Sequence, residues 1–288
     1  MKKIFFVLIL FLLMIAQIRL TSVIKAQESR GSEITLENLS QSDQIIYRER
    51  LEAEIEDQHA QLLSQLNTYQ NDERNFRVAH DQYTRLQTLN SIEGVVNSAK
   101  SLIKSRNTAL YSYLNLLRLK IVEAEGIEMF HKERVIERIL SVQFQIDEHS
   151  SKVDSVVSRE EINELAEEFS SISELITETS YYALSVLSVG KLQAVYDQSV
   201  VINQRIIEEE GDTALIESTT RARSLAEIEK LISDLPPLFQ DIWSEINLAE
   251  ERTQGYGYLY RGLSRKLNTI YSKLSRLTAY FEEVENVK

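Results

Sequence analysis

Apolar residues recur at helical spacing along most of the chain. Near the C-terminus, the intervals between successive large apolar side chains are 4, 4, 3, 4, 3, 4 and 3 residues. Those side chains belong to Leu259, Leu263, Leu267, Ile270, Leu274, Leu277, Phe281 and Val284. This spacing places them on one stripe of a helix that packs against neighbouring helices as in a coiled coil.

A second stripe predicts a long helix over residues 44–90. Its apolar positions recur mainly at helical intervals, and they are Leu51, Ile55, Leu62, Leu66, Tyr69, Phe76, Tyr83 and Leu86. A helix of that length would reach about 70 Å at about 1.5 Å per residue. It therefore needs neighbouring helices along its whole length.

Glycine and proline divide the rest of the body into helices. Gly126 and Gly211 are expected to end helices, and Gly190 is a candidate interruption. The adjacent Pro236 and Pro237 are expected to begin a helix, because proline is tolerated in the first turn and not in the interior. The remaining helices are expected over residues 91–125, 127–149, 160–210, 212–234 and 236–254.

Ser158 and Glu161 give the clearest helix start, because they match a capping box. The boundary near residues 150–158 leaves two arrangements open for the body over 44–288, one bundle or two sub-bundles. No strand-like alternation extends over a useful length. The sequence therefore predicts an all-α fold, an elongated antiparallel helical bundle with six to eight helices, some of them long and coiled-coil-like.

Residues 1–26 have the pattern of a secretory signal, with two lysines, an apolar run and small residues at Ser22 and Ala26. The apolar run is shorter than the roughly 20 residues of a bilayer-spanning helix. Residues 27–43 are polar and are expected to form a flexible lead-in. We therefore expect an extracytoplasmic protein that is secreted, periplasmic or associated with the cell envelope. A retained signal that anchors the N-terminus in the membrane is the alternative.

The composition narrows the classes of partner. The chain has no cysteine, so helix packing rather than a disulfide framework must stabilise it. Its formal net charge is −12, and removal of the signal with its four basic residues lowers this to about −16. Such an acidic protein is not expected to bind nucleic acid.

Five basic residues lie beside the apolar stripe of the C-terminal helix, and they are Arg261, Arg265, Lys266, Lys273 and Arg276. At 100° per residue they fall within a sector of about 140°. Tyr258 and Tyr280 lie in the same segment, which contains no acidic residue over 255–281. This candidate interaction stripe could bind an anionic polymer of the cell envelope or a membrane surface.

Internal pairing is the favoured alternative for this stripe. Residues 159–178 contain seven glutamates and one arginine, a net charge of −6. Two helices of opposite charge can lie side by side with their charges flanking an apolar seam. We therefore expect the basic residues to pair mainly within the chain, against residues 159–178.

No catalytic, cofactor-binding or metal site emerges from the sequence. Glu56 and His59, and likewise Glu128 and His131, have the Glu-x-x-His spacing of di-iron bundles. A chain this rich in glutamate produces such pairs by chance, and no matching set of further ligands is evident. Glycine-rich phosphate loops and Gly-x-Ser-x-Gly elbows are absent as well. We therefore expect no cofactor and no enzymatic activity.

Aromatic residues and one uncharged segment are expected in the core. The segment is 179–190, for which insertion into a membrane by a helical pore-former is the alternative to burial. The aromatic residues are Phe76, Tyr111, Tyr113, Phe130, Phe144, Phe169, Phe239 and Trp243.

These observations favour a non-enzymatic scaffold, adhesion or protein-interaction protein of the cell envelope or exterior. Its partner would be another protein or a second copy of the chain. An extracytoplasmic ligand-binding or sensory bundle is the main alternative, in which a pocket between helices holds a small molecule. A third hypothesis is a helical pore-forming protein.

Overall fold

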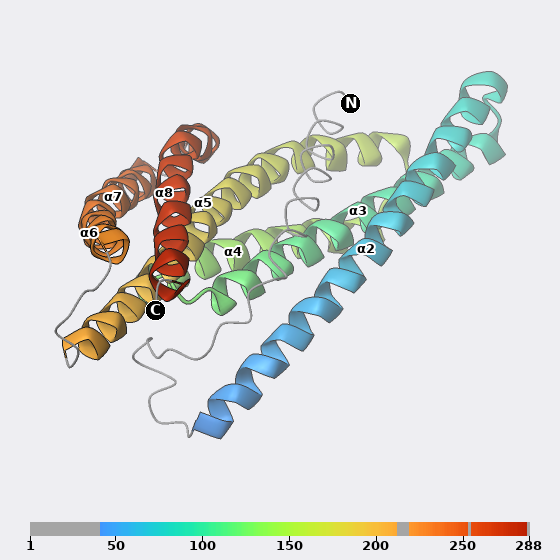
Figure 1. Cartoon of the computed structure of the whole chain (residues 1–288). Coiled ribbons are helices and arrows are strands. Elements are labelled where there is room, and N and C mark those ends of the chain that lie inside the picture. Colours follow the sequence, from blue (N-terminus) through green and yellow to red (C-terminus); the bar gives the residue numbers. More distant parts are fainter. Residues whose placement is uncertain (1–40, 212–218, 253–254, 287–288) are drawn as a thin grey trace. The chain divides into compact units, whose positions relative to one another are not determined.

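The computed structural model describes residues 41–211, 219–252 and 255–286 (Figure 1). These residues belong to one compact unit over 35–288 and form seven α-helices without a strand. The helices are α2 (Gln41–Leu86), α3 (Leu89–Glu123), α4 (Met129–Val153), α5 (Arg159–Gly211), α6 (Thr219–Asp234), α7 (Pro236–Arg252) and α8 (Tyr256–Asn286). The all-α helical bundle predicted from the sequence is confirmed.

Several predicted features lie outside the described residues. They are the signal over residues 1–26, most of the polar lead-in, and the start at residue 212 of the helix predicted over 212–234. Because α2 begins at Gln41, the last three residues of the predicted lead-in belong to a helix. The division of the body into one or two bundles stays a prediction.

Helices α2 and α3 form an antiparallel hairpin. Gln87 adopts a left-handed conformation with φ of 49°, and Thr88 caps α3. The Thr88 hydroxyl accepts a hydrogen bond from the Ser91 amide, and the Ser91 hydroxyl accepts one from the Thr88 amide. Because serine stands in place of the usual Glu or Gln, this capping box was missed in the sequence.

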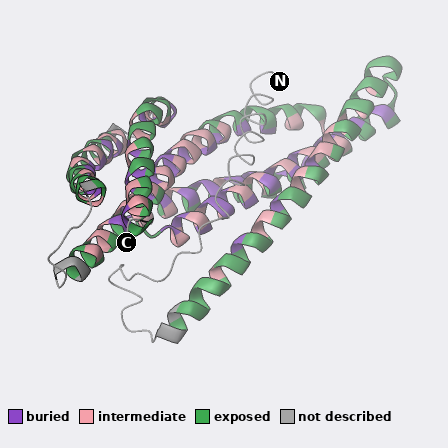
Figure 2. Cartoon of the chain, in the orientation of Figure 1, coloured by how far each residue is buried: buried purple, intermediate pink, exposed green. Residues whose placement is uncertain are grey.

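Buried residues of α2 face α3 at intervals of seven. Ile55, Leu62 and Tyr69 are buried along this seam. Among the described helices, α3 is the one against which α2 packs lengthwise. Figure 2 shows that much of the remaining surface of α2 is exposed.

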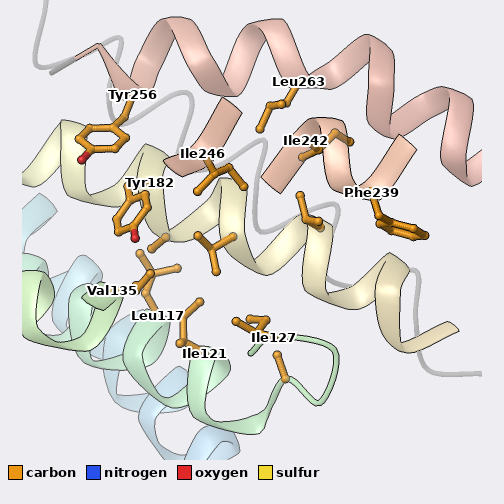
Figure 3. Packing of buried hydrophobic residues seen from close by; sticks show 14 of the residues in the cluster. Leu117, Ile121, Ile127, Val135, Tyr182, Phe239, Ile242, Ile246, Tyr256 and Leu263 are labelled. Atoms are coloured by element: carbon orange, nitrogen blue, oxygen red, sulfur yellow. The ribbon is translucent and has the colours of Figure 1, made fainter. Parts of the chain in front are cut away.

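Helices α3 to α8 all contribute to the main core. One cluster of buried residues extends from Leu114 in α3 to Val284 in α8. Helix α5 is central to it, because α5 contacts α3, α4, α6, α7 and α8. Figure 3 shows Val135 of α4, Ile246 of α7 and Leu263 of α8 approaching α5 from different helices. The predicted apolar stripe of α8 faces this core.

Close contact between two glycines brings the α3–α4 connection against α5. A Cβ on Gly126 would lie 2.1 Å from the carbonyl oxygen of Gly190, and a Cβ on Gly190 would lie 2.1 Å from Cγ1 of Ile127. Gly190 lies inside the continuous helix α5, so the interruption predicted there is wrong. Glycine is present because the backbones meet, and not because the helix bends.

Two predicted helix starts are confirmed. The Glu161 amide donates to the Ser158 hydroxyl at 3.2 Å, and the Glu161 carboxylate accepts from the Ser158 amide at 3.1 Å. Helix α6 ends at Asp234 and α7 begins at Pro236, as the proline pair indicated. Local capping chemistry sets both boundaries.

The core prediction fails for three aromatic residues. Tyr111, Phe130 and Phe144 are 37%, 51% and 69% exposed. Phe130 and Phe144 lie on the exposed side of α4, whereas Phe169 and Phe239 are buried as expected. The uncharged segment 179–190 is part of α5 and is largely buried.

A buried histidine joins α3, α4 and the start of α5. Nδ1 of His149 lies 2.9 Å from the Asn107 amide nitrogen, and Nε2 lies 2.9 Å from the Leu165 carbonyl oxygen. Because an amide nitrogen can only donate, Nδ1 accepts and Nε2 carries the proton. Burial, with a smaller contribution from nearby Arg106, lowers the pKa of His149.

This lowered pKa predicts acid sensitivity. In the unfolded chain His149 takes up a proton near its ordinary pKa of about 6.5, whereas the folded protein resists protonation. The free energy of unfolding should therefore fall as the pH drops below about 6.5. In urea unfolding between pH 7.5 and 5, the free energy of unfolding of the wild type should exceed that of His149→Gln by an amount that shrinks as the pH falls. A difference in the free energy of unfolding between the wild type and His149→Gln that stays constant with pH would contradict the prediction.

Candidate functional site

The structure pairs three members of the basic stripe with α6 and α7. Lys266 contacts both Asp241 and Glu245, which belong to α7. Lys273 lies 2.7 Å from the Asp234 carboxylate at the end of α6. These lysines point towards α6 and α7, so their charges are largely balanced within the chain.

Arg276 follows the same pattern, with its guanidinium 3.7 Å from the Glu227 carboxylate of α6. The prediction that Lys266, Lys273 and Arg276 pair with residues 159–178 is therefore wrong. Helix α5 packs on the apolar side of α8, and its Glu178 instead accepts a hydrogen bond from the Tyr256 amide at 2.7 Å. Charge totals along the sequence could not show which face of α8 each neighbour covers.

The open remainder of the stripe consists of Tyr258, Arg261 and Arg265. Arg261 donates from Nε to the Gly257 carbonyl and lies over the Tyr258 ring, which is 79% exposed. Arg265 is exposed and makes no ion pair with any described residue. Tyr280 instead packs against the core.

A different group of polar residues converges around Glu250, near the end of α7. The Glu250 side chain is only 6% exposed. Its carboxylate accepts hydrogen bonds from Arg134 of α4 and from the Tyr182 hydroxyl of α5. The arginine balances the charge of the buried carboxylate, which would otherwise be costly.

His131 completes this group. Its Nδ1 lies 3.8 Å from the Glu250 carboxylate and has no hydrogen-bond partner among the described residues. The imidazole stacks on Trp243 with the ring centroids 4.4 Å apart and the planes 15° from parallel. The nearby acid is thus Glu250 of another helix. Glu128, which precedes His131 by three residues in the sequence, lies at the N-cap of α4.

Beside Glu250 lies a cleft of about 450 Å³ between α4, α5 and the α7–α8 junction. It is lined by Arg134, Glu137, Arg138, Ser141, Val142, Gln145, Leu175, Thr179, Tyr182, Glu250 and Tyr256. The α4 residues recur at helical spacing along one face, and Leu175, Thr179 and Tyr182 do so on α5. Figure 3 shows the rings of Tyr182 and Tyr256 side by side, and their centroids are 4.9 Å apart.

The two tyrosines remain neutral in this environment. Burial, followed by the hydrogen bond and charge of Glu250, raises the pKa of Tyr182. Burial likewise raises the pKa of Tyr256. Neutral phenols and a charge-balanced carboxylate can orient a ligand, and they supply no activated nucleophile.

The sequence did not indicate this cleft. Glu250 is 116 residues from Arg134 and 68 residues from Tyr182 in the chain. The available signal was the arginine pair Arg134 and Arg138 on one face of α4, which flanks the acidic Glu137 and resembles an ordinary solvated helix.

No group of three or more His, Asp or Glu side chains in residues 41–211, 219–252 and 255–286 is arranged to hold a metal ion. None of the helices within those ranges has both the length and the apolar character needed to span a bilayer. Comparisons with protein families, with curated proteins and with solved structures found no match to this chain.

Proposed function

We propose that this chain is an exported, non-enzymatic binding protein that holds a small molecule in the cleft between α4, α5 and the α7–α8 junction. The observation that supports this function is the convergence of polar side chains from four helices, α4, α5, α7 and α8, on a cleft of about 450 Å³. Small-molecule sites typically have volumes of about 300–1,000 Å³ and place a few polar groups among apolar walls. Export rests on the signal pattern of residues 1–26.

The chemistry of the cleft supports binding over catalysis. The Glu250 charge is balanced by Arg134, and the neutral Tyr182 hydroxyl donates its proton to Glu250. Leu175, which is half-buried, provides apolar contact area. These groups would fix the orientation of a ligand without forming or breaking its bonds.

Thermal unfolding with a panel of amino acids, organic acids, sugars, amines and nucleotides tests this function. A ligand present at ten times its Kd should stabilise the protein by about 1.4 kcal/mol, which raises the Tm by a few degrees. Ser141→Trp, which fills the cleft from an exposed position, should abolish the shift, and Ser151→Trp, outside the cleft, should retain it. A panel without any shift sensitive to Ser141→Trp would overturn the proposal.

A scaffold or protein-interaction role is the second candidate. It is favoured by the 46-residue helix α2, whose surface is mostly exposed beyond its seam with α3. Sedimentation of the wild-type protein should then show a concentration-dependent dimer. Charge reversal on the exposed side of α2, away from the seam, should weaken that dimer.

A further inference from the structure

Arg138 is held in place at the wall of the cleft. Its Nε donates to the hydroxyl of Thr179, which is completely buried, at 3.1 Å. Its guanidinium carbon lies 4.8 Å from the ring centroid of Tyr256. Contacts with α5 and α8 therefore fix the guanidinium of this α4 residue before any ligand arrives.

The terminal nitrogens of Arg138 have no partner among the described residues. No described carboxylate lies within ion-pair distance of them, and the one hydrogen bond of the side chain uses Nε. The other arginine of the cleft, Arg134, is already bound by Glu250. Arg138 thus presents two parallel N–H donors, the geometry that binds a carboxylate in bidentate fashion.

The surroundings of Arg138 favour a ligand with one negative charge. Arg134 and Glu250 balance each other, and Glu137, which also lines the cleft, is exposed to solvent that screens its charge. Ser141 and Gln145, on the same face of α4, add neutral donors. The half-buried side chain of Leu175 offers apolar contact. A dianionic phosphate would bring more negative charge than Arg138 alone can balance.

We propose that the cleft binds small monocarboxylates, with the carboxylate on the terminal nitrogens of Arg138 and the apolar part against Leu175. This assignment rests on the proposed binding function and adds its ligand class. The observations that carry it are the fixed guanidinium, its unpaired donors and the ion pair of Arg134 with Glu250, which leaves Arg138 as the cleft-lining arginine available to a ligand.

Isothermal titration with matched probes tests the ligand class. Benzoate and butyrate should bind at least tenfold more tightly than benzamide and butyramide, which have similar shapes and no charge. Arg138→Gln should remove this preference. Arg138→Lys, which keeps the charge and loses the planar fork, should weaken benzoate binding about tenfold. Arg74→Gln, at an exposed position of α2 away from the cleft lining, should leave binding unchanged. Circular dichroism establishes that each variant is folded. If Arg138→Gln does not fold, the loss of affinity in Arg138→Lys becomes the test of the assignment.

The outcomes separate this assignment from the proposed function. If benzamide binds as tightly as benzoate, or if inorganic phosphate binds more tightly, the monocarboxylate assignment is overturned. Loss of binding in Ser141→Trp would then still support a small-molecule cleft. Carboxylate binding that persists in both Arg138 variants also overturns the assignment. If neither these probes nor the wider panel binds, both proposals fail.

Discussion

Gly126→Ala should lower the free energy of unfolding by about 3 kcal/mol, near the upper end of the range for overpacked cores. The added Cβ would lie 2.1 Å from the Gly190 carbonyl oxygen and 2.4 Å from the Ala194 amide nitrogen. Both are backbone atoms of α5, so no side chain can rotate to relieve the clash. The α3–α4 connection would have to move away from α5 and expose Ile127, which is buried.

Gly94→Ala is the matched control for this effect. Gly94 lies inside α3, and no atom lies within 4 Å of the position of its added Cβ. Alanine should therefore stabilise the helix by about 0.5–1 kcal/mol. Urea unfolding followed by circular dichroism should show opposite shifts for the two variants, with similar m-values. A Gly126→Ala protein as stable as the wild type would contradict the close contact between the two backbones.

The glycine contact illustrates what sequence patterns cannot show. The apolar stripe of α8 could be predicted because its periodicity is local, and the structure buries Leu263, Ile270 and Leu274 along it. The helix boundaries at Ser158 and Pro236 could be predicted because capping and proline geometry act within one turn. A glycine needed for contact with a distant backbone has the same local signature as one that ends a helix.

The same distinction explains the candidate site. The basic stripe was visible because its members share one helix, but their partners depend on which neighbours cover each side of α8. Glu250 gave no signal, because its segment AEER resembles an exposed helix end. Only packing brings it to Arg134 and Tyr182. Sites assembled from several helices require the tertiary structure, whereas sites within one helix do not.

Tyr182→Phe should lower the free energy of unfolding by about 2 kcal/mol, the typical value for a hydrogen bond to a charged group. The phenylalanine ring would keep the packing against Tyr256, so the change isolates the hydroxyl. The buried Glu250 carboxylate would lose one of its two donors and could not recover it from water, because its side chain is 6% exposed.

Tyr196→Phe provides the comparison on the same helix, because its hydroxyl donates to the neutral Ile232 carbonyl at 3.3 Å. Tyr196→Phe should lower the free energy of unfolding by less than Tyr182→Phe does, at most about 1 kcal/mol. In a Glu250→Gln background, Tyr182→Phe should cost about half as much as in the wild type, since charge-assisted hydrogen bonds are roughly twice as strong as neutral ones. Equal costs in both backgrounds would show that the Tyr182 hydroxyl does not stabilise the Glu250 charge, and the arrangement of buried groups beside the cleft would need revision.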